Sequence, residues 1–259
     1  MARQIDKNIL AKHKENALKT FNDYMDMLIS SDDPRLQGKA DKLSYWLEDW
    51  TRFLSFEPQF SPNSLRRYKR GEIVKVHLGF NVGSEEGGLH YAVVLDKNNS
   101  VNSPVVTVVP LTSVKPNTNI EKLHKGSVFL GNELFTSLSG KIASLQRITD
   151  SERKQLHKMV GSIEHVMTAP DDEIDSMKQH LDDLFKECAL LDRTKKEISK
   201  MKSGSIALIG QVRAISKIRI YDPKTNYDVL SGIKLSNEKL DLIDREILAL
   251  YTNAGLTLE

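Results

Sequence analysis

A histidine stands where a glycine-rich segment meets an apolar run. Residues 79–88 contain four glycines and two adjacent glutamates, residues 91–95 read Tyr-Ala-Val-Val-Leu, and His90 lies between them. An imidazole at the edge of a strand could serve as a general acid or base. The alternative is a hydrogen-bonded histidine with a structural role, because histidines are commonly half-buried without catalysing anything. His90 is therefore a candidate that other residues must support.

Several familiar catalytic patterns are absent from the sequence. A phosphate-binding loop opens a helix, whereas residues 79–88 carry Glu85 and Glu86 and run into a predicted strand. The seven histidines are scattered and form no helical pair with metal-ligand spacing. No Gly-x-Ser-x-Gly motif suggests a hydrolase nucleophile. The single cysteine, Cys188, excludes an internal disulfide and a cysteine-built zinc site. We therefore expect a site without metal or cofactor.

Composition indicates where the protein works but not what it does. Of 259 residues, 39% are hydrophobic and 28% are charged, and the net charge is +2. This profile excludes a disordered or collagen-like chain. Because no basic excess covers the whole chain, any nucleic-acid site must be local, with residues 66–70 and Arg213 as candidates. We find no membrane-spanning run and no apolar core of a signal peptide, so we expect a cytoplasmic protein.

The helices and strands that must position these residues are predicted from the spacing of apolar residues and from the positions of Gly, Asn and Pro. Residues 1–56 predict a helical N-terminal extension. Short β-branched runs separated by Gly, Asn and Pro predict an antiparallel β unit beginning in residues 57–132. Residues 133–203 predict a helical insertion. Residues 204–259 return to strand over 205–220 and end in a helix, completing the unit. We expect an α+β protein with one continuous core and helical additions.

Within the predicted helices, the sequence also indicates which residues are buried and which one caps a helix. Trp46 and Trp50 lie on the apolar stripe of the second N-terminal helix, which predicts a buried face, with a partner-binding groove as the alternative. Cys188 lies on the stripe of residues 174–191 and is predicted to be a small core residue. Ser236 is the expected N-cap of the final helix.

Three segments become specific when taken together and in this order. The first includes Gly-Gly-Leu-His-Tyr-Ala-Val-Val-Leu at 87–95, the second ends in Pro-Leu-Thr-Ser at 110–113, and the third contains Gly-Gln-Val-Arg at 210–213. Together they resemble the MazF/PemK family of toxin endoribonucleases. The resemblance covers residues 69–130 and 203–251, which is less than half of the chain.

This resemblance implies a fold and an activity. The fold would be an SH3-like antiparallel β-barrel of the MazF/PemK/CcdB-like type, usually a homodimer. The activity would be metal-independent cleavage of single-stranded RNA, in which the ribose 2′-hydroxyl attacks the neighbouring phosphorus. The protein would be the toxin of a type II toxin–antitoxin system, with a cognate antitoxin protein as its partner.

The resemblance also assigns roles to residues. His90 aligns with the family's arginine and is proposed as general acid or base, and Thr112 keeps the family's catalytic threonine position. Arg213 would supply the positive charge lost with that arginine. RNA binding is assigned to five residues: Ser84, Glu85, Ser113, Gln211 and Arg213.

Some positions depart from the family pattern. Besides His90, Gly210 stands where relatives carry an acidic residue, and Ser216 replaces the usual aspartate. These departures keep an alternative open, in which a catalytically inactive MazF-like barrel binds RNA or protein. A third interpretation, poisoning of DNA gyrase by protein contact, ranks lower because the threonine and glutamine positions match the ribonucleases better.

Overall fold

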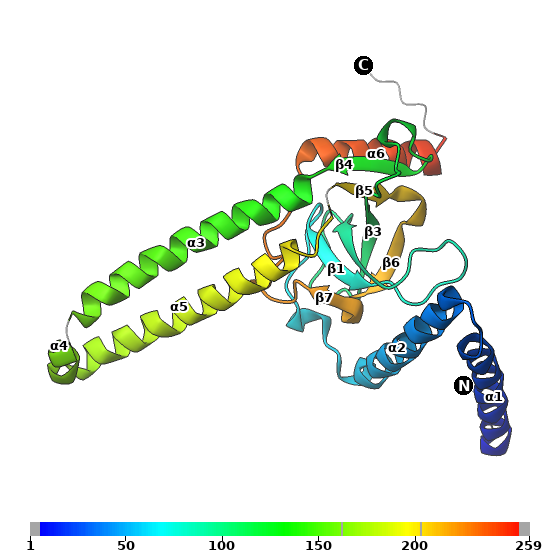
Figure 1. Ribbon diagram of the computed structural model, residues 1–259, viewed down its shortest axis with the longest axis horizontal. Coiled ribbons are helices and arrows are strands. Elements are labelled where there is room, and N and C mark those ends of the chain that lie inside the picture. The colour runs from blue at the N-terminus through cyan, green and yellow to red at the C-terminus, as the bar shows by residue number, and fades with distance from the viewer. Residues whose placement is uncertain (1–5, 162, 203, 254–259) are drawn as a thin grey trace. The chain divides into compact units, whose positions relative to one another are not determined.

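The computed structural model describes residues 6–161, 163–202 and 204–253. The chain divides into two compact units, with the boundary after Gln59. Figure 1 labels the helices and strands of both.

The first unit is a pair of helices. α1 (Lys7–Ile29) begins after Asp6, and α2 (Pro34–Phe56) begins after Asp33. In both cases the aspartate carboxylate accepts a hydrogen bond from a backbone N–H of the first turn, as N-cap residues do. A 3₁₀ turn (Glu57–Gln59) follows α2.

The contact between α1 and α2 lies close to the turn that joins them. Met25 and Leu28 of α1 pack with Ala40 of α2 to form a small core. Trp46 is half-buried, and its ring centroid lies 6.3 Å from that of Phe53. Trp50 is 47% exposed. Because α1 covers only the beginning of α2, the predicted buried face is wrong for Trp50.

The second unit is built on an antiparallel sheet of seven strands, in the order β4-β5-β3-β2-β1-β7, with β6 paired to β3 outside this path. Among the described residues β4 and β7 end the path and do not pair with each other, so the sheet is open. The expectation of a closed barrel is corrected on this point. The strands are β1 (Ile73–His77), β2 (Leu89–Val94), β3 (Val105–Ser113), β4 (Ser127–Gly131), β5 (Ser205–Leu208), β6 (Arg213–Ser216) and β7 (Ile220–Asp222).

β3 changes partner along its length. Its first four residues pair with β6, and Leu111–Ser113 pair with β5. Val109 and Pro110 lie between these two stretches, where the opposite chain forms the 3₁₀ turn Ile209–Gln211. A proline, which has no N–H to donate, suits a position where the strand partner is interrupted.

The region predicted to return to strand over 205–220 forms three short strands. The turns Ile209–Gln211 and Lys217–Arg219 separate β5, β6 and β7. The sequence pattern does not show these interruptions, because β-branched residues recur through both turns. Two further 3₁₀ turns are Pro62–Ser64 and Ile120–Lys122.

Alternate side chains of the strands enter two different cores. On β1, Ile73 belongs to one cluster and Val74 to the other, and Val109 and Val108 divide in the same way on β3. The first cluster includes leucines of the long helices, and the second contains Tyr68. The period of two explains why these strands are apolar on both faces.

Two long helices join β4 to β5. α3 (Glu133–Val160) and α5 (Asp171–Ile198) lie side by side, with the short α4 (Ile163–Thr168) at the end far from the sheet (Figure 1). Leu138 of α3 and Leu190 of α5 join the first core cluster at the other end. Neither of these helices, nor any other described helix, is long and apolar enough to cross a membrane. We call this element the helical hairpin.

The buried stripe of α5 is narrower than predicted. Met177 and Leu191 are buried, but Leu181 is 40% and Phe185 is 64% exposed, and Cys188 is also exposed. These three lie on one flank of the helix, which α3 alone does not cover. The prediction that Cys188 is a core residue is wrong for this reason.

The final helix, α6 (Asn237–Tyr251), begins as predicted. The Ser236 hydroxyl accepts a hydrogen bond from the Lys239 N–H at 3.3 Å. Leu240 and Ile243 on its inner face are buried in the first core cluster.

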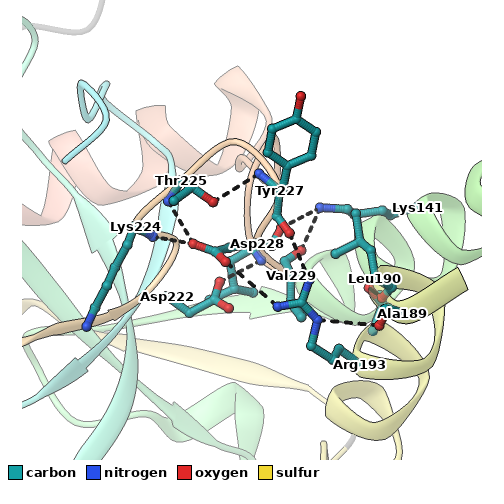
Figure 2. Close-up of polar contacts among 12 residues, drawn as sticks. Lys141, Ala189, Leu190, Arg193, Asp222, Lys224, Thr225, Tyr227, Asp228 and Val229 are labelled. Carbon is teal, nitrogen blue, oxygen red and sulfur yellow. Dashed lines mark hydrogen bonds and ion pairs between the residues drawn. The ribbon is translucent and has the colours of Figure 1, made fainter. Parts of the chain in front are cut away.

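The base of the hairpin holds the loop that follows β7. The ammonium group of Lys141 on α3 donates to the carbonyl oxygens of Asp228, Val229 and Ser231 at 2.9, 2.8 and 2.8 Å (Figure 2). Burial lowers the pKa of Lys141. The ammonium therefore fills the role that a bound cation would have among these carbonyls.

The same loop is also fixed through Asp228. Its carboxylate accepts the N–H groups of Lys224 and Thr225 at 2.8 and 2.7 Å (Figure 2). Arg193 of α5 donates to the carbonyl oxygen of Tyr227 at 3.2 Å and lies 4.0 Å from the Asp228 carboxylate. The loop and both long helices are thus one structural element.

We expect Lys141→Met to lower the free energy of unfolding by about 2–3 kcal/mol, because buried carbonyls lose a charged donor. Urea denaturation measures the loss. Lys154→Met, at an exposed position of the same helix, is the matched control. Equal stability of the two variants would show that the ammonium does not hold the loop.

Candidate active site

His90 is held at both ring nitrogens. It lies on β2 opposite Val76 of β1. Its Nδ1 is 3.2 Å from the carbonyl oxygen of Leu111, and its Nε2 is 3.1 Å from Oε1 of Glu86. Both neighbours are hydrogen-bond acceptors, so only the doubly protonated imidazolium donates to both. A proton on either ring nitrogen therefore has an acceptor, the Leu111 carbonyl at Nδ1 or the Glu86 carboxylate at Nε2.

Thr112 and His90 line the same pocket, which has a volume of about 250 Å³. Thr112 is half-buried and Ser113 is exposed, and both belong to the end of β3. The Leu111 carbonyl that holds His90 directly precedes Thr112. The two predicted catalytic residues, together with Ser113, are therefore brought together as expected.

The other predicted RNA-binding residues line a second pocket. Ser84, Glu85, Gln211 and Arg213 surround a volume of about 640 Å³, together with Gly210. A Cβ added to Gly210 would meet nothing within 4 Å. An acidic side chain would fit there, so this departure removes a charge without changing the backbone.

The two pockets are joined through the loop between β1 and β2. The Gln211 side-chain oxygen accepts the Glu86 N–H, and its amide nitrogen donates to the Ser84 carbonyl at 3.2 Å. Glu86 in turn contacts His90. Gln211 thus fixes the loop that carries the carboxylate partner of His90.

Arg213 does not join His90 and Thr112. Its guanidinium donates to the backbone and side-chain oxygens of Gln211, both at 3.4 Å. It lines the second pocket, and the residues that line the His90 pocket do not include it. Arg213 therefore lines a different pocket from His90, and its predicted role of supplying the lost positive charge stays a prediction.

The basic segment 66–70 is also used mainly for structure. Arg66 forms an ion pair with Glu72 at 2.7 Å, and both side chains are largely buried. Arg70 pairs with Asp244 of α6 and donates to the carbonyl of Leu95 at 2.7 Å. These two arginines attach the start of the sheet to its surroundings, whereas Arg67 and Lys69 are exposed, and the expected part of this segment in an RNA groove stays a prediction.

Comparison with known proteins finds a family model that matches part of the chain. Residues 69–185 match the family model of the PemK-like, MazF-like toxin of type II toxin–antitoxin system. Through this region the chain is similar to the PemK/MazF family. A type II toxin family implies an antitoxin partner. No curated protein matches the chain.

The PemK/MazF match and the sheet cover different parts of the chain. The match includes β1 to β4 and continues through α3 into α5. It excludes residues 205–222, which form β5, β6 and β7. Because these strands pair with β3, β4 and β1, the structure joins the two parts into one sheet.

One network at this PemK/MazF site was not predicted from the sequence. Glu197, at the end of α5, accepts hydrogen bonds from the ammonium of Lys75 and the hydroxyl of Tyr91. Lys75 and Tyr91 face each other across β1 and β2, and the ammonium lies 5.4 Å from the centre of the tyrosine ring. Both line the His90 pocket. The hairpin is thereby bonded to the wall of the candidate active site.

Burial sets the protonation states in this network. Burial, and then the hydrogen bond to Glu197, raises the pKa of Tyr91, which keeps its hydroxyl a donor. Burial acts to raise the pKa of Glu197, but the hydrogen bonds from Lys75 and Tyr91 hold it below its ordinary value of 4.5. Glu197 is therefore ionised at neutral pH and balances the charge of Lys75.

We expect Glu197→Gln to lose about 1–3 kcal/mol of stability at pH 7, because a charged acceptor is removed from two largely buried donors. The pH dependence supplies a second readout. Glu197 ionises below 4.5 in the folded chain, so its stabilisation is complete above pH 4.5 and is lost as the pH falls through the folded pKa.

Urea denaturation between pH 7 and pH 4 measures both effects. Wild type should lose more stability than Glu197→Gln as the pH falls, so that the two curves converge. Parallel curves would show that Glu197 carries no stabilising charge.

Proposed function

We propose that this protein is a metal-independent endoribonuclease that cleaves single-stranded RNA, and that it is the toxin of a type II toxin–antitoxin pair. The observation that carries the proposal is the pocket shared by His90 and Thr112, within the part of the chain that matches the PemK-like, MazF-like toxin model. We further propose that it acts in the cytoplasm as a homodimer and is neutralised by a cognate antitoxin protein.

In the proposed reaction the ribose 2′-oxygen forms a bond to the adjacent phosphorus. The bond from phosphorus to the 5′-oxygen breaks, leaving a 2′,3′-cyclic phosphate and a 5′-hydroxyl. The 2′-hydroxyl proton passes to solvent, and the 5′-oxygen needs a proton as it leaves. Orientation and charge stabilisation lower the barrier to this step.

His90 supplies the leaving-group proton in this proposal. Its Nδ1 lies 3.2 Å from the Leu111 carbonyl oxygen, and its Nε2 lies 3.1 Å from the half-buried Glu86 carboxylate. Glu86 is then a positioning residue, because it orients the ring without lining the pocket. In this proposal the hydroxyl of Thr112, which lines the same pocket, donates to a phosphoryl oxygen.

The activity is tested with pure protein, single-stranded RNA and EDTA, followed by identification of the ends. We expect cutting that leaves 2′,3′-cyclic phosphate and 5′-hydroxyl ends. His90→Ala should reduce kcat about 10²–10⁴-fold, the usual cost of losing a general acid.

His124→Ala is the matched control, because His124 is exposed and lies on the loop before β4. Intact RNA at high protein concentration would refute the proposed activity. Equal cutting by both variants would refute the role of His90.

The alternative is an inactive member of the family that binds RNA or protein. It is favoured by the second pocket, where Gln211 and Arg213 are present but Gly210 contributes no acid. Retention of RNA in a gel shift without any cleavage would select this alternative.

A further inference from the structure

Lys202 lines three pockets, two of which also contain Thr112. It lines the pocket of His90 and Thr112, a smaller pocket of about 110 Å³ that also contains Thr112, and a groove of about 590 Å³ beside Pro116 and Ile120. It comes from the segment between α5 and β5, so the helical hairpin delivers it to the site.

The described lining of the His90 pocket contains lysines and no carboxylate. Its cations, apart from His90, are Lys75, Lys115 and Lys202. Glu197 neutralises Lys75. Within the described parts of the chain, the side chains of Lys115 and Lys202 make no ion pair. These two ammonium groups are therefore the charges available to an anion in the pocket.

The segment that carries Lys202 is fixed on both sides. Before it, Glu197 is bonded to Lys75 and Tyr91, and the Met201 N–H donates to the Ile198 carbonyl at 3.0 Å. This attachment holds the end of α5 against the pocket wall.

After Lys202, Gly204 is held against the end of β3. Its carbonyl accepts the Val114 N–H at 3.2 Å. Its φ is +77°, and an added Cβ would lie 2.7 Å from a methyl group of Val114. Only glycine allows this close approach, so Lys202 lies two residues before a backbone position that is held against β3, and it lines two pockets together with Lys115.

We infer that Lys202 binds the phosphodiester that is cleaved and that Lys115 binds a neighbouring phosphate in the adjoining groove. This inference rests on the proposed function and identifies which residues supply the positive charge that Arg213 does not bring to His90. A compact ammonium suits the non-bridging oxygens of a phosphate. The apolar side chains of Pro116 and Ile120 in the same groove suit the adjacent nucleotide.

The test compares full-length wild type with Lys202→Ala, Lys202→Arg and Lys97→Ala. Lys97 is an exposed lysine outside the pockets described above, so its replacement makes the same change in net charge. One readout is kcat/KM on single-stranded RNA. The other is the binding of a single-stranded DNA oligonucleotide, which has no 2′-hydroxyl to react, measured by fluorescence anisotropy over a range of salt concentrations.

We expect Lys202→Ala to lower kcat/KM about 10²-fold, as for loss of one transition-state donor. The slope of log affinity against log salt should fall by about 0.7, corresponding to one phosphate contact fewer on a single strand. Lys202→Arg should retain most of the kcat/KM and most of the salt slope, and Lys97→Ala should resemble wild type in both measurements.

The outcomes separate the inference from the proposed function. If wild type cleaves RNA and Lys202→Ala behaves like Lys97→Ala, the inference is wrong and the proposed function stands. If wild type binds the oligonucleotide through Lys202 but does not cleave RNA, the phosphate site stands and the proposed activity is wrong. If wild type neither binds nor cleaves, both are overturned.

Discussion

The rest of the second unit depends on the pairing of β3 with three other strands. β2 lies on one side of it, and β6 and then β5 share the other. Because β3 changes partner near Pro110, its last three residues pair with β5 instead of β6. The Leu111 carbonyl then anchors His90, and Thr112 enters the pocket. The position of both proposed catalytic groups is therefore a consequence of how one strand divides its hydrogen bonds.

Hydrogen bonds and ion pairs between different elements hold the site in place around this strand. Gln211 holds the loop between β1 and β2, and that loop presents Glu86 to His90. On the other side, Glu197 bonds the hairpin to Lys75 and Tyr91. Each support joins residues from different elements, which reduces the freedom of the pocket before any substrate arrives.

Local pattern was sufficient for some features of the molecule. The antiparallel strands that begin in residues 57–132 and the cap at Ser236 agree with the sequence analysis, because each depends on neighbouring residues. Features set by long-range pairing were not predictable. Whether the sheet closes depends on which edges meet, and the bond from Tyr91 to Glu197 spans 106 residues. The sequence position of Arg213 likewise does not tell which pocket its side chain lines.

The tether at Glu197 also has a consequence for biosynthesis. The residues of the proposed reaction come early in the chain, but one wall of their pocket follows α5. Contacts between such distant residues form late in folding, after the intervening chain has been ordered. A nascent or truncated chain that ends before α5 is complete contains His90 and Thr112 but has only part of their pocket. Such a chain lacks the complete site while it is still on the ribosome, close to the RNA that encodes it.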